Sequence, residues 1–287
     1  MPSTSSHVRS ASGLDLHERR WPVDATPRAS VLVIHGLGEH GARYERTAGI
    51  MNGAGLGVVA LDLSGFGASG GRRGHLARWD DWLDDVGAAL RRVRGEAPER
   101  PVVLLGHSLG GLVCLSYAES ERPQPDLLVL SSPALASSVP GWKQQAARIV
   151  GRVVPTLPIA NSIKGSDLSR DPAVGVDYVA DPLNQPATTA GLGRLILEAQ
   201  DRAVGSVERV RIPTLVTHGE ADPLVPCACS EILAAVPGVE RRTYPELRHE
   251  TLNEPEGPAV AADMVAWIEL HLPPAAEPSR PTDLTLS

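Results

Sequence analysis

The fold of this chain is decided by the stretch from Pro101 to Ala118, PVVLLGHSLGGLVCLSYA. Its first five residues form an apolar run typical of a buried strand, and the run from Gly110 to Ala118 has the composition of a helix. Between them, Gly106-His107-Ser108-Leu109-Gly110 reads G-x-S-x-G. A strand, a tight glycine-containing turn and a helix are the context in which such a serine projects from the end of a sheet as a nucleophile. The pentapeptide alone recurs by chance, so this context carries the prediction.

The composition is that of an ordinary globular chain. It has 287 residues, 42% hydrophobic and 21% charged, with a net charge of −7. This length suits one large α/β domain with an insertion. The sequence has no basic run and only 3% aromatic residues, so we expect no nucleic-acid partner.

The beginning of the chain lacks the apolar core of a signal peptide, and no apolar run approaches the length of a membrane span. The three cysteines do not form a metal-binding pattern, and a structural disulfide is not expected. We therefore expect a cytoplasmic protein, with peripheral contact to a membrane left open.

Strand-like and helix-like segments alternate along most of the chain, which predicts a mostly parallel sheet with helices on both faces. We expect Gly13–Trp21 to be an antiparallel edge strand and the first half-dozen residues to be loose. Between residues 133 and 210 we expect no strand, only two amphipathic helices at Trp142–Val154 and Leu192–Ala203. The chain then divides into a core (1–132 and 211–272), a helical cap (133–210) and a disordered tail (273–287).

A serine nucleophile needs a base, and the base needs an orienting acid. Asp222 follows an apolar strand in the loop Gly-Glu-Ala-Asp-Pro, and His249 follows the last strand. The order Ser108, Asp222, His249 is the order used by α/β-hydrolases. Glu220 is a competing acid, but it directly abuts the strand end. Of the nine histidines, only His249 lies in a loop after a strand and C-terminal to the acid.

An oxyanion hole needs two backbone N–H groups directed at one oxygen. One is assigned to Leu109, next to the nucleophile. The other is assigned to Leu37, in the loop His35-Gly-Leu-Gly-Glu-His-Gly41 that follows the strand at Val31–Ile34. His35 is interpreted as a structural hydrogen-bonding residue and not as a second base.

The segment from His35 to Glu45, HGLGEHGARYE, resembles the H-G-x-G-E-H-x-x-R-Y segment of monoacylglycerol lipases. The elbow GHSLGG and four further segments are also similar: SSPAL at 131–135, LSRDP at 168–172, DPL at 181–183 and HETLNE at 249–254. The resemblance runs from about residue 12 to 272. It implies the α/β-hydrolase fold, with a mostly parallel central sheet, helices on both faces and a helical cap inserted after the sixth strand.

The resemblance also implies a serine hydrolase that cleaves monoacylglycerol to fatty acid and glycerol through an acyl-enzyme on Ser108. No cofactor and no metal are expected, and the expected partner is a small lipid ester. The cap would form an apolar acyl tunnel, and Trp142 is either a membrane contact or a core residue. The sequence departs from the family pattern in two segments, SGFGAS at 64–69 and NQP at 184–186. The second lies in the insertion, so the resemblance predicts the reaction more firmly than the substrate.

Two other functions stay open. One is a different serine-dependent activity on the same triad, as a general carboxylesterase, lysophospholipase or thioesterase. The other is a non-catalytic ligand-binding protein on the same scaffold, because fold alone does not establish function. A haloalkane dehalogenase or epoxide hydrolase is disfavoured because those enzymes carry Asp at the elbow.

Overall fold

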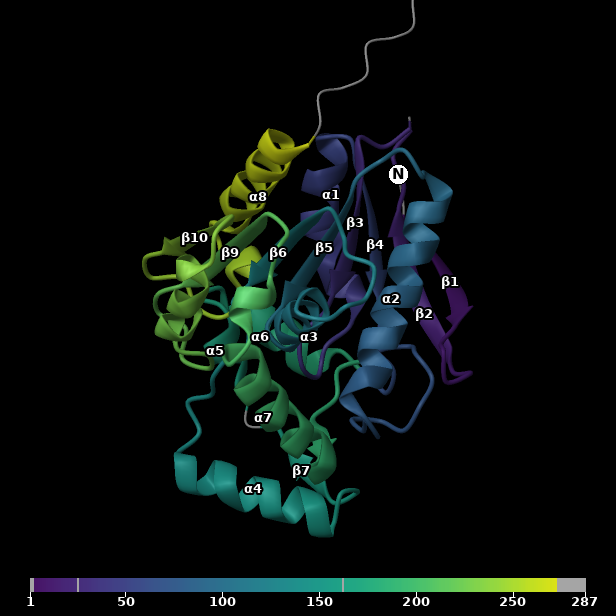
Figure 1. Cartoon of the computed structure of the whole chain (residues 1–287). Coiled ribbons are helices and arrows are strands. Elements are labelled where there is room, and N and C mark those ends of the chain that lie inside the picture. Colours follow the sequence, from purple (N-terminus) through teal and green to yellow (C-terminus); the bar gives the residue numbers. More distant parts are fainter. Residues whose placement is uncertain (1–2, 25, 162, 273–287) are drawn as a thin grey trace, which may run out of the picture.

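A computed structural model describes residues 3–24, 26–161 and 163–272 of the chain. The tail predicted from residue 273 lies outside the described residues. The centre of the molecule is an eight-stranded sheet in the order β1-β2-β4-β3-β5-β6-β9-β10 (Figure 1). The strands are β1 Thr4–Arg9, β2 Asp15–Trp21, β3 Ala29–Ile34, β4 Leu56–Leu61, β5 Val102–His107, β6 Leu127–Ser131, β9 Thr214–Gly219 and β10 Val239–Tyr244.

From β4 to β10 every neighbouring pair is parallel, and only the β1–β2 and β2–β4 pairs are antiparallel. In the centre Leu32 is in register with Val59 on one side and Leu104 on the other. These strands read as nearly continuous apolar runs because both faces of a parallel sheet are covered. The carboxyl ends of the strands therefore meet at one edge, where the loops after β3, β5, β9 and β10 come together.

Helices cover both faces of the sheet. The pair α1 (Glu45–Gly53) and α8 (Gly257–His271) packs on one face, and α2 (Trp79–Glu96) and α3 (Leu109–Ala118) pack on the other (Figure 1). Each face has its own core cluster, and successive residues of β3 alternate between them, with Leu32 in one and Val33 in the other. Short 3-10 helices are found at Gly41–Tyr44, Val207–Arg209, Cys227–Ala235 and Thr251–Asn253.

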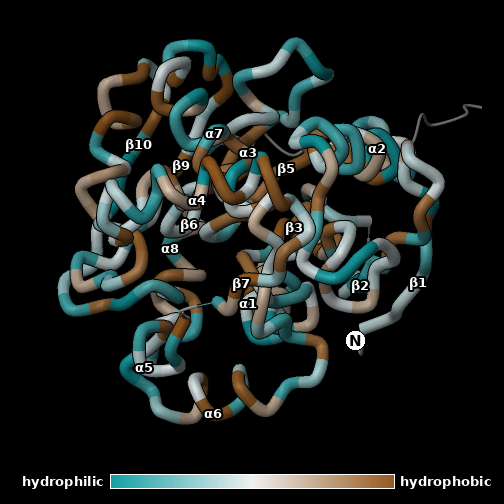
Figure 2. Tube along the Cα trace, turned by 90° about the horizontal axis from the view of Figure 1, so that it is seen from below, coloured by the Kyte–Doolittle hydropathy of each residue, from teal (hydrophilic) through white to brown (hydrophobic). Residues whose placement is uncertain are grey.

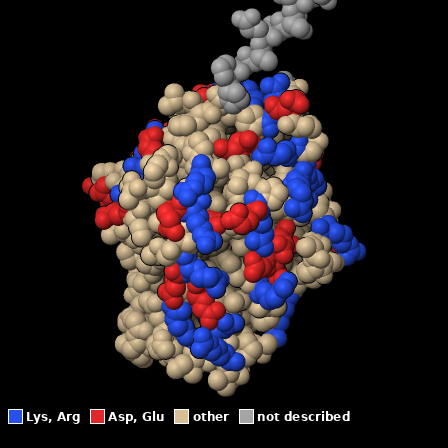
Figure 3. All heavy atoms as spheres, in the orientation of Figure 1, with Lys and Arg blue, Asp and Glu red and all other residues tan. Residues whose placement is uncertain are grey.

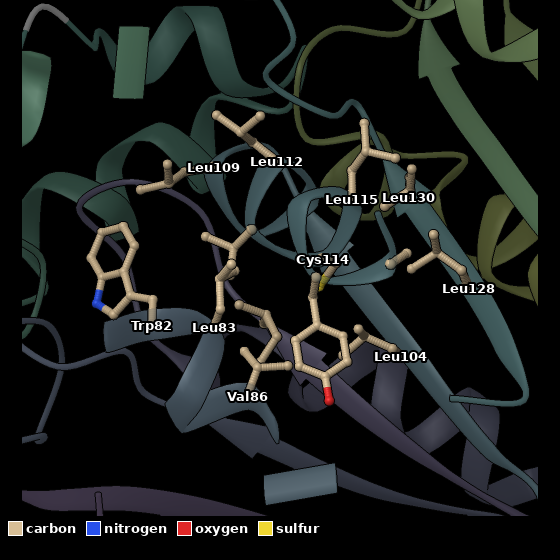
Figure 4. Close-up of a cluster of buried hydrophobic side chains, with 14 of the residues drawn as sticks. Trp82, Leu83, Val86, Leu104, Leu109, Leu112, Cys114, Leu115, Leu128 and Leu130 are labelled. Carbon is tan, nitrogen blue, oxygen red and sulfur yellow. The ribbon is translucent and has the colours of Figure 1, made fainter. Parts of the chain in front are cut away.

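Figure 4 shows part of the cluster between these helices and the sheet, to which α2 contributes Trp82 and Val86, α3 contributes Leu112 and Leu115, and β5 contributes Leu104. The apolar residues of α2 recur at helical spacing and form its buried side: Trp79, Leu83, Val86, Leu90 and Val93. Cys114 is a buried free thiol in the same cluster. This packing fixes α3, and with it the turn that carries Ser108.

Two predictions about the N-terminal region are wrong. Residues 4–9 are not loose: they form β1, which pairs in antiparallel register with β2. β2 pairs with β1 and β4 and is therefore not an edge strand. The side chains of β1 are mostly exposed, so backbone hydrogen bonds hold this strand and its sequence, TSSHVR, has no apolar alternation to reveal it.

A helical cap is inserted after the sixth strand, β6. It contains α4 (Gly141–Val153), α5 (Gly165–Leu168), α6 (Pro172–Ala180) and α7 (Ala190–Val204). Contrary to the prediction, it also contains strands, because β7 (Pro158–Ala160) pairs antiparallel with β8 (Ala187–Thr189). Three residues per strand are too few to show a period in the sequence. The boundaries at residues 133 and 210 remain predictions.

Charged groups of both signs are interspersed over the face shown in Figure 3, with no large area of one sign. Several of them form ion pairs between elements, as Arg122 does with Asp80 and Asp84 of α2. None of the helices described between residues 3 and 272 has the combined length and hydrophobicity that crossing a bilayer requires.

The packing between α3 and the sheet predicts the effect of a cavity there. Replacing the fully buried Leu112 by alanine should lower the free energy of unfolding by about 2–5 kcal/mol, since the site is walled by rigid elements. The matched control is Leu270→Ala, whose side chain is 78% exposed and whose loss should cost under about 0.5 kcal/mol. Denaturant unfolding measures both, and equal values would contradict the assignment of this core.

Candidate active site

Ser108 lies on the turn between β5 and α3 with φ 52° and ψ −116°. A positive φ at a residue with a Cβ costs about 1–3 kcal/mol and persists only when the surroundings enforce it. Here the surroundings are two close backbone approaches. A Cβ on Gly106 would overlap the carbonyl of Gly110, and a Cβ on Gly110 would overlap the carbonyls of Ile34 and His35. Glycine is therefore required at both positions of the turn.

The turn brings three predicted site residues together. His249 Nε2 lies 2.8 Å from Ser108 Oγ, and His249 Nδ1 lies 2.7 Å from Asp222 Oδ2. The other carboxylate oxygen, Oδ1, accepts N–H bonds from Leu224 and Val225, each 2.9 Å long. The imidazole of His249 thus lies between the carboxylate of Asp222 and the hydroxyl of Ser108, which is the arrangement that lets an imidazole take a proton from a hydroxyl group.

The electrostatics of His249 suit a base. Burial by itself would lower the pKa of this imidazole, but the charge and hydrogen bond of Asp222 outweigh burial, and Glu250 and Glu39 add to them, so the pKa is raised. Burial by itself would raise the pKa of Asp222. The charge of His249 and the hydrogen-bonding groups of His249, His218 and the Val225 N–H outweigh burial, and they hold that pKa well below its usual range. Asp222 therefore stays ionised when His249 gains a proton.

Ser108 and His249 line a cavity of about 550 Å³ beneath the cap. A volume between 300 and 1,000 Å³ is typical of small-molecule sites. The wall is largely apolar and comes mostly from α4, α7 and the loops after β6 and β9. Its described members include Ala134, Val139, Ala147, Ile163, Ile196, Leu197, Leu224 and Val225.

The two residues assigned to the oxyanion hole, Leu37 and Leu109, also line this cavity. Leu109 is the first residue of α3, where backbone N–H groups have no partner within the helix. In the described part of the chain, neither the Leu37 N–H nor the Leu109 N–H donates a hydrogen bond to the protein. Two free donors from residues that line the same cavity as Ser108 are what an oxyanion requires.

The competing residues lie elsewhere. Glu220 bonds the hydroxyl of Thr243 on the exposed side of β10. His35 is fully buried, bonds the Gly36 carbonyl through Nδ1 and receives the Leu63 N–H on Nε2, which is the structural role predicted for it. His107 packs its ring 4.9 Å from the ring of His249 and bonds the Ser131 carbonyl.

The sequence did not reveal which side chains hold the loop after β3, the loop that contains Leu37. Glu39 accepts the Gly36 N–H, and Arg43 bridges Glu39 to Glu250, the residue next to His249. A second connection runs to the cap, where the Gln185 N–H donates to the Gly38 carbonyl at 2.8 Å and His40 bonds Asp181. The signal was present in the motifs HGLGEHGARYE and DPL, which we interpreted through resemblance without deriving their contacts.

No group of three or more His, Cys, Asp or Glu side chains in the described ranges has the arrangement of a metal site. The eight-stranded, mostly parallel sheet with a serine on the turn after β5 defines an α/β-hydrolase.

Comparison with known proteins agrees with this class. Residues 25–256 match the family described as serine aminopeptidase, S33. The chain is 34% identical to a monoacylglycerol lipase of Mycolicibacterium smegmatis over 88% of this chain and 92% of that protein. It is also 34% identical to human monoglyceride lipase, over 76% of this chain and 73% of that protein. The crystal structure of a Paleococcus ferrophilus monoacylglycerol lipase matches with a TM-score of 0.80 and 32% identity, over 89% and 99% of the two chains.

The chain therefore belongs to this serine hydrolase family, within the group that contains the monoacylglycerol lipases. It is a hydrolase of carboxylic esters.

The raised pKa of His249 predicts the pH dependence. The base must be neutral to accept a proton, so activity is lost as the pH falls through the pKa of His249. Because Asp222 raises that pKa above its ordinary value of 6.5, the acid limb of kcat/KM for an aryl ester should have its midpoint above 6.5. The rate of fluorophosphonate labelling should follow the same limb. A midpoint below 6.5 in both measurements would contradict the assignment of Asp222 as the partner.

Proposed function

We propose that Ser108, His249 and Asp222 form the catalytic triad and that the chain hydrolyses monoacylglycerols to fatty acid and glycerol. The observation that carries the triad is the continuous chain of bonds from Asp222 Oδ2 through His249 to Ser108 Oγ, 2.7 Å and 2.8 Å long. Leu37 and Leu109 are proposed as the oxyanion donors. No other group is required for this chemistry.

In the proposed reaction His249 Nε2 takes the hydroxyl proton as Ser108 Oγ attacks the ester carbonyl. The carbonyl oxygen becomes an oxyanion facing the N–H groups of Leu37 and Leu109. When the tetrahedral intermediate collapses, the C–O bond to glycerol breaks and His249 returns its proton to the leaving oxygen. A water molecule then repeats the sequence on the acyl-enzyme, releasing the fatty acid and restoring Ser108. Asp222 stays ionised throughout and holds the imidazole in the required tautomer.

The cavity supports a lipid substrate. Its apolar wall would stabilise an acyl chain by about 0.8 kcal/mol per buried CH₂ group, so a medium or long chain gains several kcal/mol. The described wall also contains polar side chains, among them Gln144, Asn161, Thr188 and Gln200, and they offer hydrogen-bonding groups to a glycerol head. The names of the relatives from Mycolicibacterium smegmatis and Paleococcus ferrophilus support the same substrate.

The cavity argues against a peptide substrate, although the family is described as an aminopeptidase family. An aminopeptidase must hold the charged amino terminus of its substrate, and a desolvated ammonium group needs an anionic partner. Among the described residues that line the cavity none is Asp or Glu, and Lys143 supplies a positive charge. A neutral ester with an apolar chain suits this lining better.

A hydrolysis panel tests the substrate. We expect kcat/KM to be highest for monoacylglycerols and lower for di- and triacylglycerols, lysophospholipids, thioesters and short soluble esters, with no cleavage of amino-acid anilides. The physical reason is a single neutral head group and a single acyl chain in a cavity of about 550 Å³. Preference for a lysophospholipid, a thioester or a short ester would replace the monoacylglycerol proposal by that activity on the same triad.

Replacement of the nucleophile tests the triad. Ser108→Ala should abolish fluorophosphonate labelling and lower kcat by on the order of 10⁶-fold, as in other serine hydrolases whose nucleophile is removed. Ser116→Ala, on the same helix α3, is the control and should retain both labelling and activity. Unchanged turnover in folded Ser108→Ala protein would refute the triad, whereas a parent chain with neither labelling nor turnover would favour the ligand-binding alternative.

We further propose that the segment 133–210 acts as a lid and that α4 contacts a membrane or micelle. Trp142, Ile149 and Val153 are 72%, 56% and 75% exposed, and their spacing places them on one side of α4. Trp142 is therefore not a core residue. The charged residues of α4 are all basic. Arg148 and Arg152 pair with Asp201 and Glu198 of α7, whereas Lys143 lies beside the ring of Trp142 and favours an anionic lipid surface. Seen from below in Figure 2, α6 has further hydrophobic residues, and Val176 and Val179 are exposed on it.

A vesicle-binding experiment tests this contact. The triple variant Trp142→Ser, Ile149→Ser, Val153→Ser should bind phosphatidylglycerol vesicles at least about tenfold more weakly than the parent chain, because three exposed apolar side chains no longer leave water. Leu270→Ser, an equally apolar and exposed position on α8, should leave binding unchanged. Equal binding by the triple variant in flotation assays would contradict a role for α4.

A further inference from the structure

His218 is a buried polar residue that the proposed reaction does not use. It lies in β9, four residues before Asp222, and its side chain is fully inaccessible to solvent. Its Nε2 lies 3.1 Å from the Val225 carbonyl oxygen and 3.3 Å from Asp222 Oδ2. Two oxygens that only accept hydrogen bonds face this nitrogen, so Nε2 carries a hydrogen.

Val225 links His218 to the carboxylate of Asp222, because its backbone bonds both residues. Val225 donates its N–H to Asp222 Oδ1 at 2.9 Å, and its carbonyl accepts the Nε2–H of His218. Both Asp222 oxygens thereby have a polar neighbour behind them: Oδ1 accepts backbone N–H groups, and Oδ2 lies 3.3 Å from Nε2 of His218. His249 Nδ1 approaches Oδ2 from the other side.

The orientation of His218 is itself fixed by a chain of polar groups leading away from the cavity. His218 Nδ1 lies 3.1 Å from Ser230 Oγ, and Ser230 Oγ accepts the Nε–H of Arg241 at 2.9 Å. Arg241, on β10, also donates to the Cys227 carbonyl. The ring of His218 is therefore bonded at both nitrogens and has no free rotation about its terminal bond.

We propose that His218 is a positioning residue for Asp222, holding the carboxylate at the angle and distance at which it orients His249. The proposal rests on the proposed triad and concerns its geometry, not its substrate. A displacement near 1 Å in a catalytic arrangement costs on the order of 100-fold in rate. His218 touches no reacting atom and acts only through Asp222.

Loss of this support has a signature in the pH profile. The groups that face His249 are Asp222, Glu250, Glu39 and the ring of His107. Only Asp222 among them is in contact with His218. If the carboxylate turns away, its attraction for the proton of His249 weakens and the pKa of His249 falls. The midpoint of the acid limb of kcat/KM then moves to lower pH.

The test compares two amides that differ by one methylene. In His218→Gln the amide nitrogen takes the place of Nε2 and keeps the bond to Val225, whereas in His218→Asn it takes the place of Nδ1 and keeps only the bond to Ser230. Active sites are counted with a fluorophosphonate, and kcat, KM and the pH profile are measured on a small aryl ester. We expect H218N to lose 10- to 100-fold in kcat per active site, with KM little changed and the acid limb shifted down, and H218Q to stay within about threefold of the parent.

A merely structural role gives a different result. If His218 only fills space, both variants lower the thermal midpoint, and the kcat per active site and the pH profile stay unchanged, which overturns the proposal. Equal losses of kcat in H218Q and H218N also overturn it. Asp222→Asn, measured alongside, separates the two questions. Full activity in D222N contradicts the proposed triad, whereas a disabled D222N with a fully active H218N contradicts only the role of His218.

Discussion

The structure depends on the close approach of three backbone segments at the turn that carries Ser108. Gly106, Gly110 and the carbonyls of Ile34 and His35 lie so near one another that a single Cβ at either glycine would overlap an oxygen. This contact joins β3, β5 and α3, and it keeps Ser108 in its strained conformation. The loop after β3 is fixed by the same contact, so the nucleophile and the Leu37 N–H are placed together.

The sequence predicted this central part well because each prediction rested on a strong local constraint. A buried parallel strand must be apolar on both faces, and the turn after β5 admits only glycine at two positions. The order of Ser108, Asp222 and His249, combined with strand ends that meet at one edge, was enough to place three distant residues within hydrogen-bond distance. The side-chain bonds confirm that they meet; their catalytic roles remain a proposal.

The sequence was less informative where backbone pairing or long-range contact decides the structure. β1 is held by a backbone ladder and buries little, so its residues did not distinguish it from a loose end. The β7–β8 hairpin is too short for a pattern. His218 lies within a strand and precedes the acid, and its proposed role depends on contacts through Val225 that no local sequence pattern reveals.

The cap is bonded to the oxyanion segment through Gln185 and Asp181, yet it supplies none of the three triad side chains. The acyl-facing wall, by contrast, comes largely from α4 and α7. The proposed triad and most of the cavity wall thus lie in separate stretches of the chain. If the cap selects the substrate as proposed, substitutions in the inserted stretch change the lipid that is bound and leave the three triad side chains in place.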